Sequence, residues 1–290
     1  MAAVKGTDHM KYLIINADDF GLNEVVVQAI CELFESGLIS STSCMTNKPA
    51  WPQAAAYLRR NPDFAAGVHL VFNDGYPVLP GQQVPALLRE DGQFMSDRQI
   101  MWGFKPGAGG QLYAELKAQI ERFIQDVGRL PDHLDNHCSV SYARPDRFQI
   151  TLDLAQEYKV PIRAPFGDDL NRIAPLLAKQ NNLPAWQIRW LGRFYRRKVD
   201  RAGIPRPNTF IQHFSAAGNQ TPEYLLGIMD DLKDGWISEL LVHPGYDGDW
   251  REEDLRALLD PRIRQRLAEP DIELVNFTTM LHLQNEGAAS

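Results

Sequence analysis

The sequence has few cysteines, no long apolar run and no excess of basic residues. Three cysteines among 290 residues are too few and too scattered for a disulfide framework or a CxxC metal site, which favours a reducing, cytoplasmic setting. No apolar run approaches the roughly 18 residues that a membrane span needs. Thirty basic residues against 37 acidic ones give a net charge of −7. This balance argues against nucleic acid as a partner, because phosphate binding depends on Lys and Arg.

Short β-rich runs alternate with longer segments of helical periodicity, which is typical of β–α units around a parallel sheet. The eight predicted strands are Tyr12–Ala17, Ser41–Thr46, Ala66–Val71, His133–Cys138, Val160–Ala164, Thr209–Phe214, Glu239–His243 and Ile272–Asn276. Eight strands are what a β/α barrel requires. We therefore predict an α/β fold: a single-domain TIM-like (β/α) barrel, regular or distorted, over residues 11–283, with two long loop insertions and flexible termini at 1–10 and 284–290.

Six helices are predicted between the strands: Glu24–Glu35, Gln111–Val127, Asp146–Tyr158, Pro184–Arg201, Thr221–Leu232 and Glu252–Leu267. Two connections, Asn73–Gly110 and Phe166–Asn208, are too long to be simple turns. Long insertions in a compact α/β domain are commonly binding or lid segments.

Ionisable residues gather where the predicted strands end. They are Asp18, Asp19, His69, Asp135, His137, Arg163 and His243. In a β/α barrel the carboxyl ends of all strands share one face, and active sites are built there. Residues far apart in the sequence are therefore expected to converge at one site.

Asp18 and Asp19 are the strongest local signal. Neighbouring side chains on a strand point apart, so two aspartates predict two roles: one as a metal ligand, the other as a base within reach of water. The alternative is a pair of helix N-caps, since NADDFGLN leads into a helix. His133 and His137 are ambiguous in the same way, because a strand would place them on one face and a helix would make them an i,i+4 zinc pair.

An Asp with two His is a mixed nitrogen and oxygen ligand set. Such a set suits Zn²⁺ and tolerates Mg²⁺, Mn²⁺ or Co²⁺, so the residues do not select one ion. Three protein ligands leave room for water and substrate, as a catalytic metal needs. The sequence has no GxSxG motif and no convincing cysteine nucleophile, which argues against a covalent route.

The segment Trp186–Arg206 mixes basic and aromatic residues. One interpretation is a lid or membrane-facing helix that stacks on sugars or meets lipid head groups. The other, which we favour from sequence, is a surface helix whose aromatic side chains pack on the barrel.

Five motifs resemble, in order, those of the YdjC-like family of metal-dependent carbohydrate deacetylases: NADDFG, GVHL, LDNH, VPIRAP and VHPGY. The resemblance runs from Tyr12 to Phe277, and NADDFG, the GVHL histidine and LDxH are specific only in combination. It implies a TIM-like barrel that removes N-acetyl groups from chitooligosaccharides. One branch of the family is associated with hopanoid lipid biosynthesis.

Carried over residue by residue, the resemblance makes Asp19, His69 and His137 the metal ligands. It makes Asp18 the catalytic base, which takes a proton from the attacking water. It also implies that His243 is the acid, which protonates the leaving amine.

The chain departs from the family after the second histidine ligand. The family commonly reads D-x-H-x-H-x-H, whereas here Ser139 and Ser141 replace the two later histidines. The metal ligands are kept, but the usual sugar substrate is put in question. Asp135 and Arg163 are predicted to orient the base or the acid from behind.

We therefore predict a hydrolase that uses a divalent ion, zinc or magnesium, to remove an N-acetyl group from an amino sugar or a glycolipid. Two alternatives remain open at this point. The same site could hydrolyse another amide or an ester, or the barrel could be a catalytically inactive sugar-binding module. Peripheral membrane contact and a homodimer are also left open.

Overall fold

The chain folds around one sheet of parallel strands. The computed structural model describes residues 10–101, 107–137, 145–163, 184–248 and 250–289, with 166, 167, 170, 171, 174, 175 and 178. The strands are β1 (Lys11–Phe20), β2 (Ser41–Cys44), β3 (Ala65–Leu70), β4 (Leu134–Asn136), β5 (Thr209–Ile211), β6 (Ile237–Val242) and β7 (Ile272–Leu274). Their order is β4-β3-β2-β1-β6-β5, and β7 also pairs with β1.

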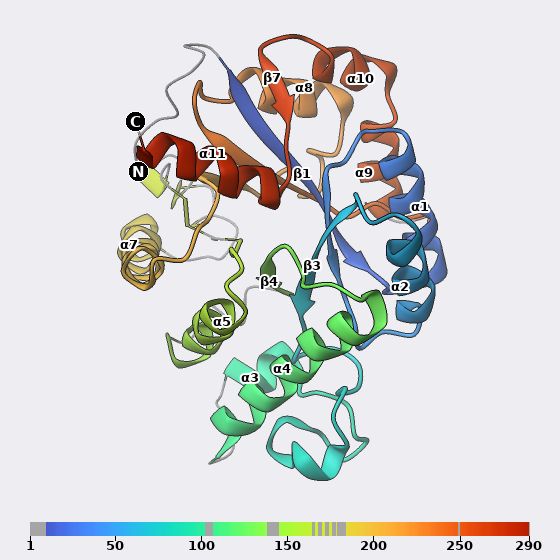
Figure 1. The fold of residues 1–290 in the computed structure, drawn as a ribbon, viewed down its shortest axis with the longest axis vertical. Helices are drawn as coiled ribbons and strands as arrows, with labels where there is room; N and C mark the ends of the chain where they lie inside the picture. The colour runs from blue at the N-terminus through green and yellow to red at the C-terminus, as the bar shows by residue number, and fades with distance from the viewer. Residues whose placement is uncertain are drawn as a thin grey trace.

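Helices connect successive strands and cover the sheet. They are α1 (Glu24–Glu35), α2 (Trp51–Arg60), α3 (Asp97–Met101), α4 (Ala108–Val127), α5 (Pro145–Tyr158), α7 (Ala185–Ala202), α8 (Pro222–Asp230), α9 (Trp250–Leu258), α10 (Pro261–Leu267) and α11 (Phe277–Ala289). Figure 1 shows α1, α2 and α9 along one side of β1, with α11 crossing on the other side.

The two faces of β1 pack into different cores, because side chains alternate along a strand. Leu13 and Ile15 belong to the large core beneath the surrounding helices. Tyr12 and Ile14 face inward and pack with Phe277 at the start of α11. The inner face therefore begins as a small apolar layer closed by α11, and Asn16 and Asp18 continue it toward the carboxyl end.

The predicted closed barrel is not confirmed. Among the described residues of the run expected to form the fifth strand, only Ile162 pairs with the sheet, through a parallel bridge to Leu134. The Pro161 carbonyl and the Arg163 amide both bond to Leu134, but Pro161 has no amide hydrogen to continue the pairing, and the Ile162 amide donates on the other edge to the Pro205 carbonyl at 3.1 Å. The sheet is thus a curled half-barrel with helices around it.

The first long connection is folded against α4. It contains two short 3₁₀ turns, Gly81–Gln83 and Pro85–Leu87, and the helix α3. The carboxylate of Glu115 accepts hydrogen bonds from the Val78 and Leu79 amides, which fixes the connection to α4.

The carboxyl end of the described chain is helical. The helix α11 continues to Ala289, past the end of the predicted domain at residue 283. Gln284 donates a hydrogen bond to the Arg206 carbonyl oxygen. In the described part of the chain, no helix is both long and apolar enough to cross a membrane.

The helix α7 makes up much of the second long connection. Its aromatic residues lie on two different faces. Tyr195 is buried and stacks on Phe166. Trp186 and Trp190 are exposed by 62% and 65%. The expectation that these aromatic side chains pack on the barrel is therefore wrong for both tryptophans.

Candidate metal and catalytic site

Asp18 and Asp19 end β1 and face the same site. Asp18 continues the inward alternation of the strand, but Asp19 has a φ of 70°, and the pairing with β2 shifts register between Ala17 and Phe20. This left-handed turn, which Asp tolerates better than most residues, brings the second carboxylate round to the first. The Nε2 atom of His69 lies 3.7 Å from Asp18 and 3.5 Å from Asp19.

Three side-chain atoms from β1, β3 and the end of β4 form a compact triangle. The Oδ1 atom of Asp19 lies 3.5 Å from His69 Nε2 and 3.4 Å from His137 Nδ1, and the two histidine nitrogens are 3.2 Å apart. Asp19 and His69 are buried, and the His137 side chain is 19% exposed. The site is therefore open to solvent on the His137 side, and also at His243, whose side chain is equally exposed.

The triangle fits a metal ion. A point equidistant from atoms at these separations lies about 2 Å from each, which is the distance at which zinc binds nitrogen and oxygen. Asp19 Oδ1 is buried and accepts no hydrogen bond within the described part of the chain. A buried carboxylate oxygen without a partner is costly unless a cation or water satisfies it. A second cluster, Asp18, His69 and Asp135, is a poorer cation site because Arg163 binds both of its carboxylates.

His69 is held in place from behind. Its Nδ1 atom lies 2.8 Å from Asp135 Oδ2, a carboxylate on the neighbouring strand β4. Because an ionised carboxylate only accepts hydrogen bonds, this contact places the imidazole proton on Nδ1 and leaves Nε2 as the free donor of a lone pair. A carboxylate behind a histidine is the usual support of a metal-binding imidazole.

Arg163 connects three buried carboxylates. Its two terminal nitrogens bind both oxygens of Asp18 at 2.7 and 2.8 Å. It also lies 2.6 Å from Asp135 and 2.6 Å from Glu239 on β6. Burial opposes the charge on Arg163, but the carboxylates outweigh it and raise the pKa of the guanidinium well above its usual range. Asp18 is therefore oriented by a fixed, charged partner.

His243 follows β6 and faces Asp18, with 4.0 Å between His243 Nε2 and Asp18 Oδ2. On the other side of the ring, Nδ1 lies 3.3 Å from Ser215 Oγ, and the Ser215 hydroxyl donates to Asp254 at 2.6 Å. Burial lowers the pKa of His243, although the charges of Asp19 and Asp18 oppose this shift.

Asp19 has a second partner opposite the triangle. Arg251 donates to Asp19 Oδ2 at 2.6 Å, so the carboxylate is fixed with its other oxygen toward the histidines. Burial disfavours ionisation of Asp19, but His137, His243 and His69 outweigh burial and hold the pKa of this carboxyl well below its usual range. Asp19 is therefore ready to act as an anionic ligand.

Known proteins are similar to this chain over most of its length. The family model described as YdjC-like protein matches residues 12–269. The chain belongs to the YdjC-like family. Two curated relatives are a carbohydrate deacetylase of Geobacillus stearothermophilus and one of Brevibacillus brevis, each 28% identical to this chain over 278 residues. Each alignment covers 92% of this chain, and it covers 97% of the first relative and 99% of the second.

A solved structure has the same fold. It is a protein of Enterococcus faecalis V583 that has been proposed to cleave cellobiose phosphate. The two chains superpose with a TM-score of 0.75 at 25% sequence identity, over 93% of this chain and 99% of that one. The curled α/β architecture is therefore shared along nearly the whole of both chains.

Within this YdjC-like chain, all seven residues predicted from sequence lie in one contact network. The roles assigned to them stay predictions. Sequence reasoning missed four further members: Arg251, Glu239, Ser215 and Asp254. Cys138, Ser139 and Ser141, where the chain departs from the family pattern, lie outside the described residues.

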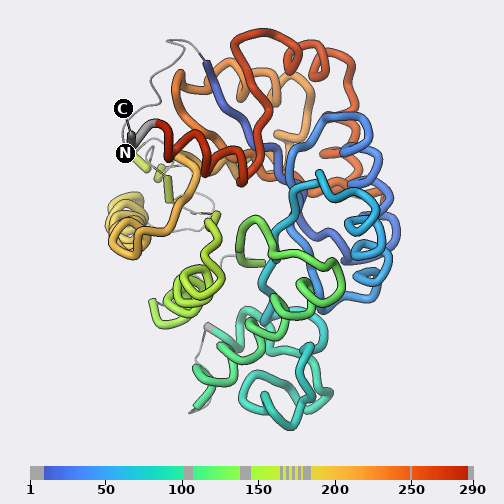
Figure 2. The backbone as a smooth tube through the Cα atoms, in the orientation of Figure 1, coloured from blue at the N-terminus to red at the C-terminus, as the bar shows by residue number. Residues whose placement is uncertain are grey.

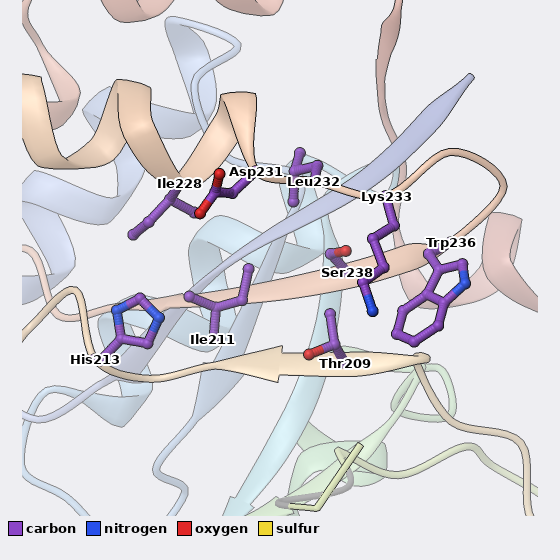
Figure 3. Close-up of a pocket in the computed structure, with 9 residues that line it drawn as sticks. All are labelled: Thr209, Ile211, His213, Ile228, Asp231, Leu232, Lys233, Trp236 and Ser238. Carbon is purple, nitrogen blue, oxygen red and sulfur yellow. The ribbon is translucent and has the colours of Figure 1, made fainter. Parts of the chain in front are cut away.

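A small cavity lies apart from this network, between β5, β6 and α8. Figure 3 shows His213 at one end of it and Trp236 at the other. Its volume of about 40 Å³ holds about one water molecule. His213 instead contacts the Tyr224 hydroxyl at 3.1 Å, so it takes no part in the predicted site.

Proposed function

We propose that this YdjC-like chain is a metal-dependent hydrolase that removes the N-acetyl group of an amino sugar. Sugar deacetylation is supported by family membership and by the carbohydrate deacetylases among its relatives. The observation that carries the metal-dependent mechanism is the triangle of Asp19, His69 and His137, with a buried carboxylate oxygen at one corner. When bound there, a divalent ion would polarise the acetyl carbonyl and lower the pKa of the attacking water.

Asp18 is the proposed general base. Arg163 holds both of its oxygens, which fixes the carboxylate plane, and Asn16 donates a further hydrogen bond to Oδ1 at 2.8 Å. Oδ2 therefore faces His69 Nε2 and the site, where it can take a proton from water. The resulting hydroxide equivalent attacks the acetyl carbon.

His243 is the proposed general acid. The single hydrogen of the Ser215 hydroxyl goes to Asp254, so Ser215 Oγ accepts a hydrogen bond from His243 Nδ1. The proton that His243 gives away must then sit on Nε2, the atom that faces Asp18. It passes to the sugar nitrogen as the carbon–nitrogen bond breaks, because an unprotonated amide nitrogen is a very poor leaving group.

The protons balance over one turnover. Asp18 gains one proton from water, and His243 loses one to the amine. Transfer from Asp18 to His243, whose facing atoms are 4.0 Å apart, restores both groups through the substrate site or an intervening water. The products are the free amino sugar and acetic acid, which loses its proton to the solvent as acetate.

The test is acetate release from N,N′-diacetylchitobiose by metal-stripped protein, with Zn²⁺, Mg²⁺, Mn²⁺ or Co²⁺ restored in turn. We expect release that depends on added metal and is lost in Asp18→Asn and His243→Ala, whereas His282→Ala, at an exposed histidine of α11, keeps full activity. Full turnover by either site variant would refute the assigned acid and base. No release by a protein that still binds one ion would refute the sugar substrate but keep the metal site.

A further inference from the structure

The helix α7 has one buried face and one exposed face, and packing against the rest of the domain does not explain the composition of the exposed face. Its buried residues recur at helical spacing, and they are Ile188, Gly192, Tyr195 and Val199. The opposite face carries a stripe with the same spacing, made of Trp186, Trp190, Arg193 and Arg197. We call these four residues the α7 stripe. All four are exposed, so the stripe is a continuous outer surface.

The charge of this helix opposes that of the whole chain. Six basic residues and one acidic residue give α7 a net charge of +5, in a chain whose net charge is −7. The residues outside α7 are therefore strongly acidic. Packing requires only the buried face of the helix and does not require a basic exposed face. The concentration of arginine on α7 therefore needs another explanation.

The tryptophans are the second independent observation. Large aromatic residues exposed by 62% and 65% cost hydrophobic free energy in water, and two of them stand one turn apart on the same face. Trp190 also stacks on Phe194, with ring centroids 6.1 Å apart, which widens the apolar strip. Figure 2 shows the helix at the outer edge of the molecule, on the side away from α1 and α2.

We infer that the α7 stripe is a docking surface for an anionic phospholipid bilayer. Tryptophan settles at the level of lipid head groups, because its ring is apolar and its N–H is polar. Arginines beside it gain from the negative surface potential of an anionic leaflet. A helix with an apolar strip and a basic polar face is the usual form of an interfacial anchor.

Vesicle flotation of the full chain tests this inference without any enzyme assay. We expect the protein to float with vesicles of phosphatidylcholine mixed with phosphatidylglycerol, and not with phosphatidylcholine alone. About 0.5 M NaCl should release most of it, because salt screens the attraction. Arg193→Gln with Arg197→Gln should weaken partitioning on the order of twentyfold, at about fivefold for each arginine.

Two further variants separate the stripe from general charge. Trp186→Ala with Trp190→Ala should weaken partitioning by about tenfold or more. Arg60→Gln with Arg256→Gln removes the same charge from α2 and α9, on the far side of the molecule, and should have little effect.

Three outcomes would overturn the inference: no flotation of the wild-type chain with anionic vesicles, equal loss in the control pair, or undiminished flotation of both stripe variants. Self-association that disappears in the tryptophan variant, without vesicle binding, would show that a second copy covers the stripe. The inference and the proposed hydrolysis are measured separately, so either can fail alone.

Discussion

Replacing Arg163 with Met should destabilise the protein in a pH-dependent manner. Met replaces the aliphatic stem of the side chain but removes the guanidinium whose charge Asp18, Asp135 and Glu239 share. All three carboxylates are buried, so the change leaves uncompensated charge in a low-dielectric interior. Removing one partner of a buried ion pair costs about 3–5 kcal/mol, and we expect a loss in that range near neutral pH.

The pH dependence follows from the pKa of the carboxyls. Burial opposes ionisation of Asp135, but Arg163 and His69 outweigh it and lower the pKa of this group. The stability that comes from a lowered carboxyl pKa is present above the ordinary value and is lost as the pH falls through the folded value. Without Arg163 the carboxyls can take up protons instead, so the difference from wild type should shrink from about pH 7 to about pH 4.

Urea denaturation at both pH values measures this effect, and Arg206→Met is the matched control. Arg206 is equally buried, but the carboxylate of Asp200 with which it pairs is half exposed. Breaking this ion pair should cost less and vary little with pH, because water can solvate the carboxylate of Asp200. A loss in Arg163→Met that is the same at both pH values, or no larger than in the control, would refute the reasoning.

Three other variants test separate parts of the site. Asp135→Asn should weaken zinc binding by about 10- to 100-fold in isothermal titration, because it disturbs the support of an imidazole ligand; unchanged affinity would contradict that role. Ser215→Ala should lower kcat by about tenfold or more without raising KM, and Ser215→Thr, which keeps the hydroxyl, should restore it. Gly67→Ala should cost about 1–3 kcal/mol in thermal unfolding, since its Cβ would lie 2.4 Å from the buried His133 ring, whereas Gly109→Ala, with no neighbour within 4 Å, should be neutral or stabilising.

The helices were predictable wherever periodicity and caps agreed. The helix α1 spans the predicted Glu24–Glu35, and the Asn23 side chain accepts from the Val26 amide at its start. The segment predicted as one helix from Glu252 to Leu267 is two, because Asp260 caps a new helix that begins at Pro261. The helices α2, α3 and α11 were missed. The helix α2 has Pro52 as its second residue, but Trp51, Ala54, Ala55 and Leu58 are buried at helical spacing, so its sequence does carry a helical periodicity.

The site was predictable as a set of strand ends but not as a geometry. Alternation along β1 predicts that Asp18 and Asp19 point apart, and only the left-handed backbone at Asp19 brings them together. No local motif announces Arg251, because it acts on Asp19 across more than two hundred residues of sequence. Glu239 looks like any strand residue until Arg163 is placed beside it. Long-range pairings of this kind depend on the fold, so they cannot be predicted from the spacing of residues along the chain.

The balance of buried charge around the site is consistent with the proposed cation. Five buried carboxylates lie in the contact network, those of Asp18, Asp19, Asp135, Glu239 and Asp254, and the guanidinium groups of Arg163 and Arg251 pair with the first four. Burial raises the pKa of Glu239 although Arg163 opposes the shift, which shows that this interior resists its full negative charge. A buried excess of negative charge must be neutralised by protons or by a cation. The pKa of Asp19 is lowered because His137, His243 and His69 outweigh its burial, so this carboxylate stays ionised. The positive charge beside it lies on protonated histidines or, as proposed, on a bound cation that replaces their protons. A divalent ion at the triangle would supply two positive charges next to Asp19 Oδ1, which is one of the buried carboxylate oxygens that no described donor satisfies.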